Sequence, residues 1–190
     1  MRKRLWRIMG QLGRVVLQRE DARVAFLWRC AVLTLLALPG GAWAADQPLF
    51  IIERSKNANV VHYDARLTAD GAWDAAQPVS AYWILLAKDK SRDELSWLEK
   101  KMAYGFALKP DAAAGGYTMK MVASPDRPIT LRLEQAAVRA EIVIDGHVSI
   151  LEKMYINSTE GLTGPKVKYI ELHGRDLQTA EQRFEKITPK

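Results

Sequence analysis

The alternation of apolar and polar side chains is the feature that most constrains the fold of this chain. It runs through most of residues 49–173. Successive side chains of a β-strand point to opposite faces, so a period of two is typical of strands with one buried face. In residues 59–67 one face carries Val61, Tyr63, Ala65 and Leu67. The other face carries His62, Asp64 and Arg66. The pattern predicts a mainly β fold.

The alternating segments and their breaks give about eight or nine expected strands. They fall at residues 49–54, 59–67, 79–87, 117–123, 129–134, 136–144, 147–156 and 166–173. The segment 79–87 is apolar on both faces, which is typical of a strand covered on both sides. Asp145-Gly146 lies between two alternating runs and predicts a tight hairpin. Residues 109–116 and 157–165 are expected to be loops.

Two segments have helical spacing instead. In residues 91–104, Ser91 and Glu94 fit a capping box, and Gly105 stands where a glycine often ends a helix. Leu95, Leu98 and Met102 recur there at helical intervals. In residues 176–187 the apolar positions Leu177, Ala180, Phe184 and Ile187 also fit a helical stripe. We therefore expect one inserted helix and one short C-terminal helix.

These elements predict a single domain over residues 45–190. It would be an antiparallel β-sandwich or β-barrel, mainly β and at the margin of the α+β class. The chain has no internal repeat, low-complexity tract or linker that would divide this region. A domain of this length buries enough surface for one core. The pattern alone does not separate a sandwich from a barrel.

The first 44 residues have the composition of a cleavable export signal. Eight basic residues precede an uncharged apolar run at residues 30–38, which is followed by Pro39-Gly40-Gly41 and Ala42-Trp43-Ala44. This order predicts cleavage between Ala44 and Ala45 and a periplasmic or secreted domain. An uncleaved anchor is the alternative, but the run is about half the roughly 20 apolar residues that span a bilayer.

This leader is long for a bacterial signal peptide. Translation from Val24 would shorten it to residues 24–44, a normal length, and residues 1–23 would then not be translated.

Removal of the leader changes the charge of the protein. Residues 45–190 contain 20 basic and 20 acidic residues, so the basic isoelectric point of the whole chain comes mostly from the leader. A neutral domain lacks the electrostatic footprint of a nucleic-acid-binding protein. The single cysteine, Cys30, lies in the leader, so the mature domain has neither disulfides nor thiolate chemistry.

Motifs for nucleotide, metal or nucleophilic chemistry are absent from the sequence. There is no G-x-G-x-x-G, no P-loop and no G-x-S-x-G, and the three histidines do not have metal-ligand spacing. His62 and Asp64 share a strand face and could begin a metal site. The simpler interpretation is a solvated surface that Arg66 continues. We therefore expect no cofactor and no bound metal.

A polar segment between two apolar strands, residues 53–59, is the first candidate site. Arg54 can bind a carboxylate or phosphate with its forked guanidinium. Asn57 and Asn59 can contact a ligand or bond their own backbone. The alternative is a hairpin turn in which Arg54 pairs with a nearby acid.

Aromatic side chains form the second candidate. They are Tyr63, Tyr82, Trp83, Trp97, Tyr104 and Phe106. Rings with polar tips can line a pocket, and Tyr63, Trp83 and Tyr104 are the ones we assign to it. Core packing is the alternative, since most of these rings fall at expected core positions.

Three segments together resemble a known family. Residues 48–64, with their R-S-x-N-x-N core followed by Tyr63-Asp64, residues 82–84 and residues 95–106 are similar to a bacterial exported domain of unknown function, DUF4833. The resemblance covers nearly the whole mature chain. It implies a single exported domain and brings no assigned catalytic residue.

The leading functional hypothesis is a noncatalytic periplasmic domain that binds a small or lipid-like ligand or an envelope partner. Arg54, Asn57 and Asn59 would supply its polar contacts, and Tyr63, Trp83 and Tyr104 its rings. One alternative is a cell-envelope hydrolase with His62 or His147 as base beside a carboxylate. Another is a purely structural or interaction protein.

Overall fold

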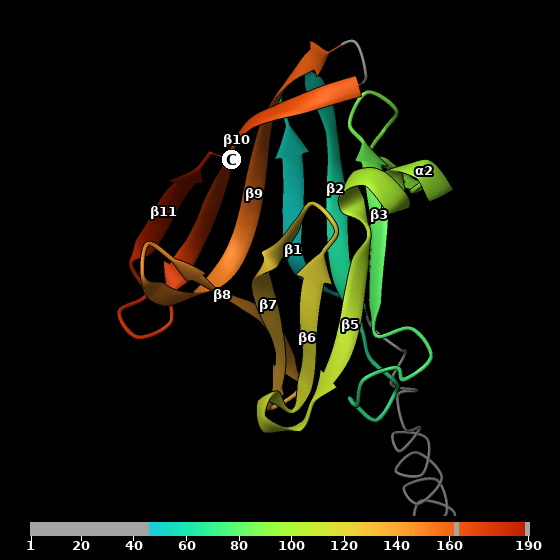
Figure 1. The fold of residues 1–190 in the computed structure, drawn as a ribbon. Helices are drawn as coiled ribbons and strands as arrows, with labels where there is room; N and C mark the ends of the chain where they lie inside the picture. The colour runs from blue at the N-terminus through green and yellow to red at the C-terminus, as the bar shows by residue number, and fades with distance from the viewer. Residues whose placement is uncertain (1–45, 162–163, 189–190) are drawn as a thin grey trace, which may run out of the picture. The chain divides into compact units, whose positions relative to one another are not determined.

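The computed structural model describes residues 46–161 and 164–188 (Figure 1). The predicted leader, its cleavage site and the alternative start at Val24 lie outside these residues. No helix in the described part of the chain combines the length and the apolar composition needed to cross a bilayer.

The described residues are mostly β, as the alternation predicts, and form eleven strands in one sheet. The strands are β1 Asp46–Arg54, β2 Asn57–Arg66, β3 Val79–Leu85, β4 Ser91–Glu94, β5 Phe106–Asp111, β6 Gly116–Met121, β7 Ser124–Glu134, β8 Ala137–Ile144, β9 His147–Gly161, β10 Gly164–Asp176 and β11 Gln182–Ile187. The helical pieces are α2 Trp97–Glu99, the π-helical turn η1 Lys100–Tyr104 that continues it, and the 3₁₀ turn η2 Ala112–Ala114.

Strand β9 organises the sheet because two branches leave from the same edge of it. Its first residues pair with β8, which leads to β7, β6 and β5. Residues 153–156 pair with β1, which leads to β2, β3 and β4. The β1–β9 pair is parallel, and the other pairs in the described residues are antiparallel. Strands β10 and β11 continue from the opposite edge of β9.

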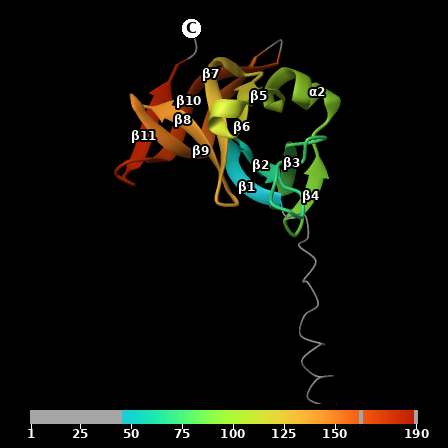
Figure 2. The same cartoon turned by 90° about the horizontal axis from the view of Figure 1, so that it is seen from below.

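The two branches face each other, and the sheet curls around the core (Figures 1 and 2). The fold is therefore one curled sheet that resembles half a barrel. The largest fully buried side chains lie on its inner face: Val61, Tyr63, Met119, Ile129, Leu131, Ile144 and Leu151. Burial of each such side chain stabilises the fold by roughly 1.5–3 kcal/mol. The inner faces of β2, β6 and β7 are those that the alternation predicts.

The inserted helix exists but begins later than the spacing predicts. Residues 91–94 form β4, which pairs with β3, and the capping box is made by Ser96 and Glu99. The sequence contains the S-x-x-E pattern twice, and strand pairing occupies the first copy. Gly105 ends the helix with an extended backbone rather than a left-handed one. A side chain there would clash with the carbonyl oxygen of Lys100.

The predicted C-terminal helix is wrong. The Asp176 carboxylate accepts hydrogen bonds from the backbone amides of Gln178 and Thr179, and Ala180 has a positive φ of 61°. This turn reverses the chain, so residues 182–187 form β11 against β10. Polar turn chemistry at Asp176 therefore outweighs the weak helical stripe that follows it.

Two predicted loops also contain strand residues, and the first of them keeps the 3₁₀ turn η2 at residues 112–114. Residues 109–111 belong to β5, and residues 157–161 extend β9 into a long hairpin with β10. The hairpin at Asp145-Gly146 is confirmed, with positive φ values of 49° and 78°. Strand β3, whose apolar faces are typical of a strand covered on both sides, is second from the edge of the sheet, beside β4.

Candidate functional site

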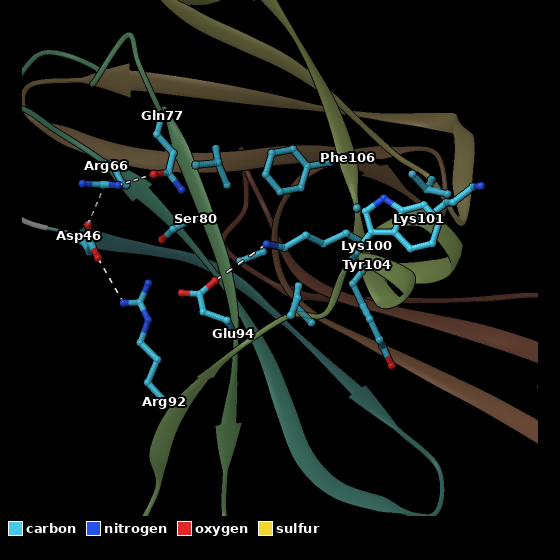
Figure 3. A pocket seen from close by; sticks show the side chains of 16 residues that line it. Asp46, Arg66, Gln77, Ser80, Arg92, Glu94, Lys100, Lys101, Tyr104 and Phe106 are labelled. Atoms are coloured by element: carbon cyan, nitrogen blue, oxygen red, sulfur yellow. Dashed lines mark hydrogen bonds and ion pairs between the residues drawn. The ribbon is translucent and has the colours of Figure 1, made fainter.

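The curled sheet leaves a cleft beside the edge of β3. Strand β4 has only four residues and pairs with residues 82–85, so no strand of the described chain covers that edge at residues 79–81. A cleft of about 700 Å³ lies here, between β3 and β4 on one side and the end of η1 with the first residue of β5 on the other (Figure 3). We call it the seam cleft.

One end of the seam cleft is polar. Its lining side chains there are Asp46, Arg66, Gln77, Ser80, Arg92 and Glu94. The other end combines apolar and basic side chains from the helix and its neighbours. They are Leu95, Trp97, Lys100, Lys101, Tyr104, Phe106 and Val122. Four cations and two carboxylates therefore line the cleft, which gives it a net positive charge.

The ion pairs of the polar end are loose (Figure 3). The Asp46 carboxylate lies 3.8 Å from the Arg66 guanidinium and 3.6 Å from that of Arg92. Where the helix borders the cleft, the Lys100 ammonium lies 3.9 Å from the Glu94 carboxylate. Arg66 donates one side-chain hydrogen bond within the described residues, to the Gln77 side-chain oxygen at 2.5 Å.

Other arginines of the domain are bound much more closely. Arg127 lies 2.7 Å from Glu185, and Arg132 lies 2.8 Å from Glu141, each with hydrogen bonds to the carboxylate. Charge-assisted hydrogen bonds have such lengths. The guanidinium groups of the seam cleft therefore keep donors available that the structural arginines elsewhere have already used.

Ser80 adds an unusual group to the floor of this cleft. The residue is 5% exposed, and its hydroxyl is the buried side-chain polar atom without a hydrogen-bond partner among the described residues. A buried polar group without a partner costs about 1–3 kcal/mol. Buried side-chain polar atoms without a partner are rare in native structures, so this hydroxyl is a donor and acceptor available at the floor of the cleft.

Beside the cleft, Tyr82 and Arg92 form a stacked pair. The Arg92 guanidinium lies 3.6 Å from the centre of the Tyr82 ring, and the Tyr82 hydroxyl donates to the buried Asp64 carboxylate. Burial, and then this bond to Asp64, raise the pKa of Tyr82 to about 12. The phenol therefore stays protonated and holds its ring under Arg92.

The polar face of β2 is only partly the solvated surface suggested by the sequence. His62, Asp64 and Arg66 do share one face, but Asp64 is buried, and His62 stacks on Tyr82. Residues 46–161 and 164–188 contain no group of three His, Cys, Asp or Glu side chains that could hold a metal ion.

The three predicted aromatic site residues lie together in the core. Tyr63 is fully buried, and its hydroxyl donates to the carbonyl oxygen of Tyr104 at 2.7 Å. Trp83 packs edge to face on Tyr104, with ring centres 5.2 Å apart. Burial raises the pKa of the Tyr63 hydroxyl well above its usual value. Of the six predicted site residues, only Tyr104 lines the seam cleft.

Arg54 lies close to this aromatic group. Burial raises the pKa of the Tyr104 hydroxyl, and the Arg54 guanidinium beside it partly offsets that effect. Partial burial acts to raise the pKa of Glu99, but hydrogen bonds from Ser96 and Trp83, with the charge of Arg54, hold it below its usual value. Arg54 therefore lies near Tyr104, which is one of the residues that line the cleft.

Asn57 and Asn59 are the first and third residues of β2, directly after the turn at residues 55–56. The Asn57 side-chain oxygen accepts a hydrogen bond from the Asn59 amide at 3.0 Å, and Lys56 takes a positive φ of 63°. These contacts match the hairpin-turn interpretation of residues 53–59. Neither asparagine lines the seam cleft.

The sequence did not single out the residues that give the cleft its charge. Arg66 was visible only as one polar position on an alternating strand, and Arg92 lay inside a predicted helix. Ser80 carried no signal, because its burial depends on how the sheet curls.

The histidines lie away from the seam cleft. His147 Nδ1 is 3.1 Å from the buried Asp176 carboxylate, and His173 Nε2 is 3.6 Å from Glu171. None of the three lines the cleft. His147 therefore has the acidic neighbour that the hydrolase alternative requires. The hydroxyl of nearby Ser149 donates to the His147 backbone carbonyl rather than to the ring.

Comparison with known proteins gives one match. The sequence profile of a family described as "Domain of unknown function (DUF4833)" matches residues 50–186. No curated protein and no solved structure shows significant similarity to the chain.

Proposed function

The chain belongs to the DUF4833 family, which has no assigned activity, and from the seam cleft we propose that it is a noncatalytic binding domain for a small anionic amphiphile. By this we mean a molecule with one phosphate or carboxylate group and an apolar body. The observation that carries the proposal is the pair Arg66 and Arg92. Their ion pairs with Asp46, and that of Arg66 with Asp74, are 3.6–3.8 Å long, and they lie beside the Ser80 hydroxyl, which has no partner among the described residues.

The cleft has the size and composition of a small-molecule site. Such sites typically measure about 300–1,000 Å³ and combine apolar walls with a few polar groups that fix orientation. An anionic head at Arg92 would replace the 3.6 Å contact to Asp46 with charge-assisted hydrogen bonds. Arg66 lies beside the same carboxylate and would share the head group.

The apolar body of the ligand would lie toward the helix. Leu95, Tyr104 and Phe106 line that part of the cleft. An amphiphile of this kind agrees with the lipid-like ligand that the aromatic pattern favours. If the leader exports the chain, the domain would meet such molecules in the periplasm or at the cell envelope.

The test is calorimetric titration of the domain with decyl phosphate, with decyltrimethylammonium as the cationic counterpart. We expect binding of the phosphate and not of the ammonium compound. Arg92→Gln should weaken decyl phosphate binding about tenfold, since a hydrogen bond to a charged group contributes about 1.5–3 kcal/mol. Arg175→Gln is the matched control, because Arg175 pairs with Glu152 on an exposed surface away from the cleft. Equal binding of both amphiphiles, or an Arg92→Gln variant that binds normally, would contradict the proposal.

A hydrolase remains the second candidate, and the pairing of His147 with Asp176 favours it. His147 would act as base toward a water molecule, oriented by the carboxylate. Hydrolysis of a chromogenic ester that disappears in His147→Ala and persists in His173→Ala would support this function. Turnover that both variants retain would remove it.

A further inference from the structure

The short helix presents large apolar side chains to solvent. Trp97 is 71% exposed, Leu98 59% and Met102 67%, while Ala103 and Tyr104 turn toward the core. The sequence places Leu98 and Met102 on a helical stripe, and the structure turns that stripe outward. Burial of apolar side chains of this size is favourable, and the described structure leaves these three exposed.

This helix is held firmly, so the exposure is not the result of a loose end. Ser96 and Glu99 form a reciprocal capping box at its start, and the Glu99 carboxylate also accepts from the Trp83 indole at 3.1 Å. At its other end the Tyr104 carbonyl accepts from the buried Tyr63 hydroxyl. The exposed side therefore has one fixed orientation relative to the sheet.

Lysines accompany the apolar side chains. The Lys101 ammonium lies 4.9 Å from the centre of the Trp97 ring, and it has no ion-pair partner within the described ranges. Lys100 lies on the same helix, loosely paired with Glu94. Val122, 46% exposed, extends the apolar surface, because its amide donates to the carbonyl of Gly105 directly after the helix. We call Trp97, Leu98, Lys101 and Met102 the helix face.

The composition of the helix face distinguishes between possible partners. Lysine is depleted in the cores of protein–protein interfaces. Tryptophan with lysine and long apolar side chains is instead typical of segments that lie at a membrane surface, where the apolar groups enter the lipid and the ammonium groups meet anionic head groups. Lysines near an anionic membrane surface add to its attraction. From this we infer that the helix face docks on an anionic lipid bilayer, a role that does not depend on the seam cleft being a ligand site.

The test is flotation of the protein with vesicles of phosphatidylcholine alone or of equimolar phosphatidylcholine and phosphatidylglycerol. We expect binding to the anionic vesicles and at least tenfold weaker binding to the neutral ones. Leu98→Ser combined with Met102→Ser should reduce binding to anionic vesicles about tenfold. These two residues do not line the seam cleft, so titration with decyl phosphate should be unchanged and separates this inference from the proposed function.

Val143→Ser combined with Val148→Ser is the matched control. These valines face each other on β8 and β9 and are also about half exposed. The control variant should bind anionic vesicles like the unmodified protein. Lys101→Glu provides a second variant that leaves the apolar side chains in place and should also weaken vesicle binding. Because Lys101 also lines the seam cleft, decyl phosphate titration of this variant is run beside the vesicle assay. Normal binding by the Leu98/Met102 or Lys101 variants, or equal binding to neutral vesicles, would overturn the inference. A dimer in solution that the Leu98/Met102 variant abolishes would also overturn it and would assign the face to a second copy of the chain.

Discussion

The buried hydroxyl of Tyr63 donates a 2.7 Å hydrogen bond to the backbone carbonyl of Tyr104, 41 residues further along the chain. This bond joins the inner face of β2 to the last residue of the helical segment. The Tyr63 ring also stacks on Phe50 of β1, with ring centres 4.6 Å apart, so two contacts fix its position. The wall of the seam cleft thus rests on a core residue that does not itself reach the cleft.

Tyr63→Phe should therefore destabilise the domain. The substitution leaves the Tyr104 carbonyl without its buried donor, which costs about 1–3 kcal/mol. Urea unfolding followed by circular dichroism measures the loss. Tyr155→Phe is the control, since Tyr155 is partly exposed and its hydroxyl has no hydrogen bond to the described residues. Equal stability of the two variants would show that the Tyr63 bond does not support the helix.

Gly105→Ala should be more damaging than Gly146→Ala. A Cβ at position 105 would clash with the backbone carbonyl of Lys100, so the helix end would have to move, at a cost of about 3 kcal/mol. Gly146 has open space around it, and its φ of 78° costs an alanine only about 1–2 kcal/mol. Thermal unfolding of both variants checks the order. If Gly146→Ala lost more stability than Gly105→Ala, the backbone after the helix would relieve the clash with Lys100 at little cost.

The alternation of side chains predicted the strands well, because each strand has one face on a single core. The expected segments 59–67 and 136–144 match β2 and β8 closely. The helix was displaced because Ser91 and Ser96 begin equal capping patterns, and only the pairing of residues 91–94 with β3 distinguishes them. Local sequence does not contain that long-range contact.

The candidate site was predictable only in part. Tyr63, Trp83 and Tyr104 do come together, since rings at core positions of neighbouring elements pack on one another. The seam cleft was not foreseen, because it lies where the short β4 leaves part of β3 uncovered. The importance of Arg92 follows from that gap in the sheet and from no motif.

Acid should remove part of the stability through the Arg127–Glu185 pair. Hydrogen bonds from Arg127 hold the pKa of Glu185 below its usual value of 4.5. A carboxyl with a lowered folded-state pKa stabilises the fold above its unfolded pKa, and the contribution is lost as the pH falls below about 4.5. We therefore expect Glu185→Gln to be less stable than the unmodified protein at pH 7 and the difference to shrink as the pH is lowered toward 3. Urea midpoints across this range test it. Asp126→Asn, at an exposed position without an ion pair in the described residues, should show no such convergence.

Arg54→Ala should weaken ligand binding without unfolding the domain. The charge of the Arg54 guanidinium acts to lower the pKa of both the Tyr104 hydroxyl and Glu99, so Arg54 lies near both groups, and we expect it to position Tyr104 at the edge of the seam cleft. It is only partly buried, and we expect its removal to change the free energy of unfolding by less than about 1 kcal/mol. Loss of ring positioning should weaken decyl phosphate binding by about three- to tenfold. Calorimetric titration and urea unfolding of the same preparation separate the two effects, with Arg175→Ala as the control for loss of a surface arginine. A variant that unfolds, or one that binds normally while losing as much stability as Tyr63→Phe, would make Arg54 a structural residue of the hairpin rather than part of the site.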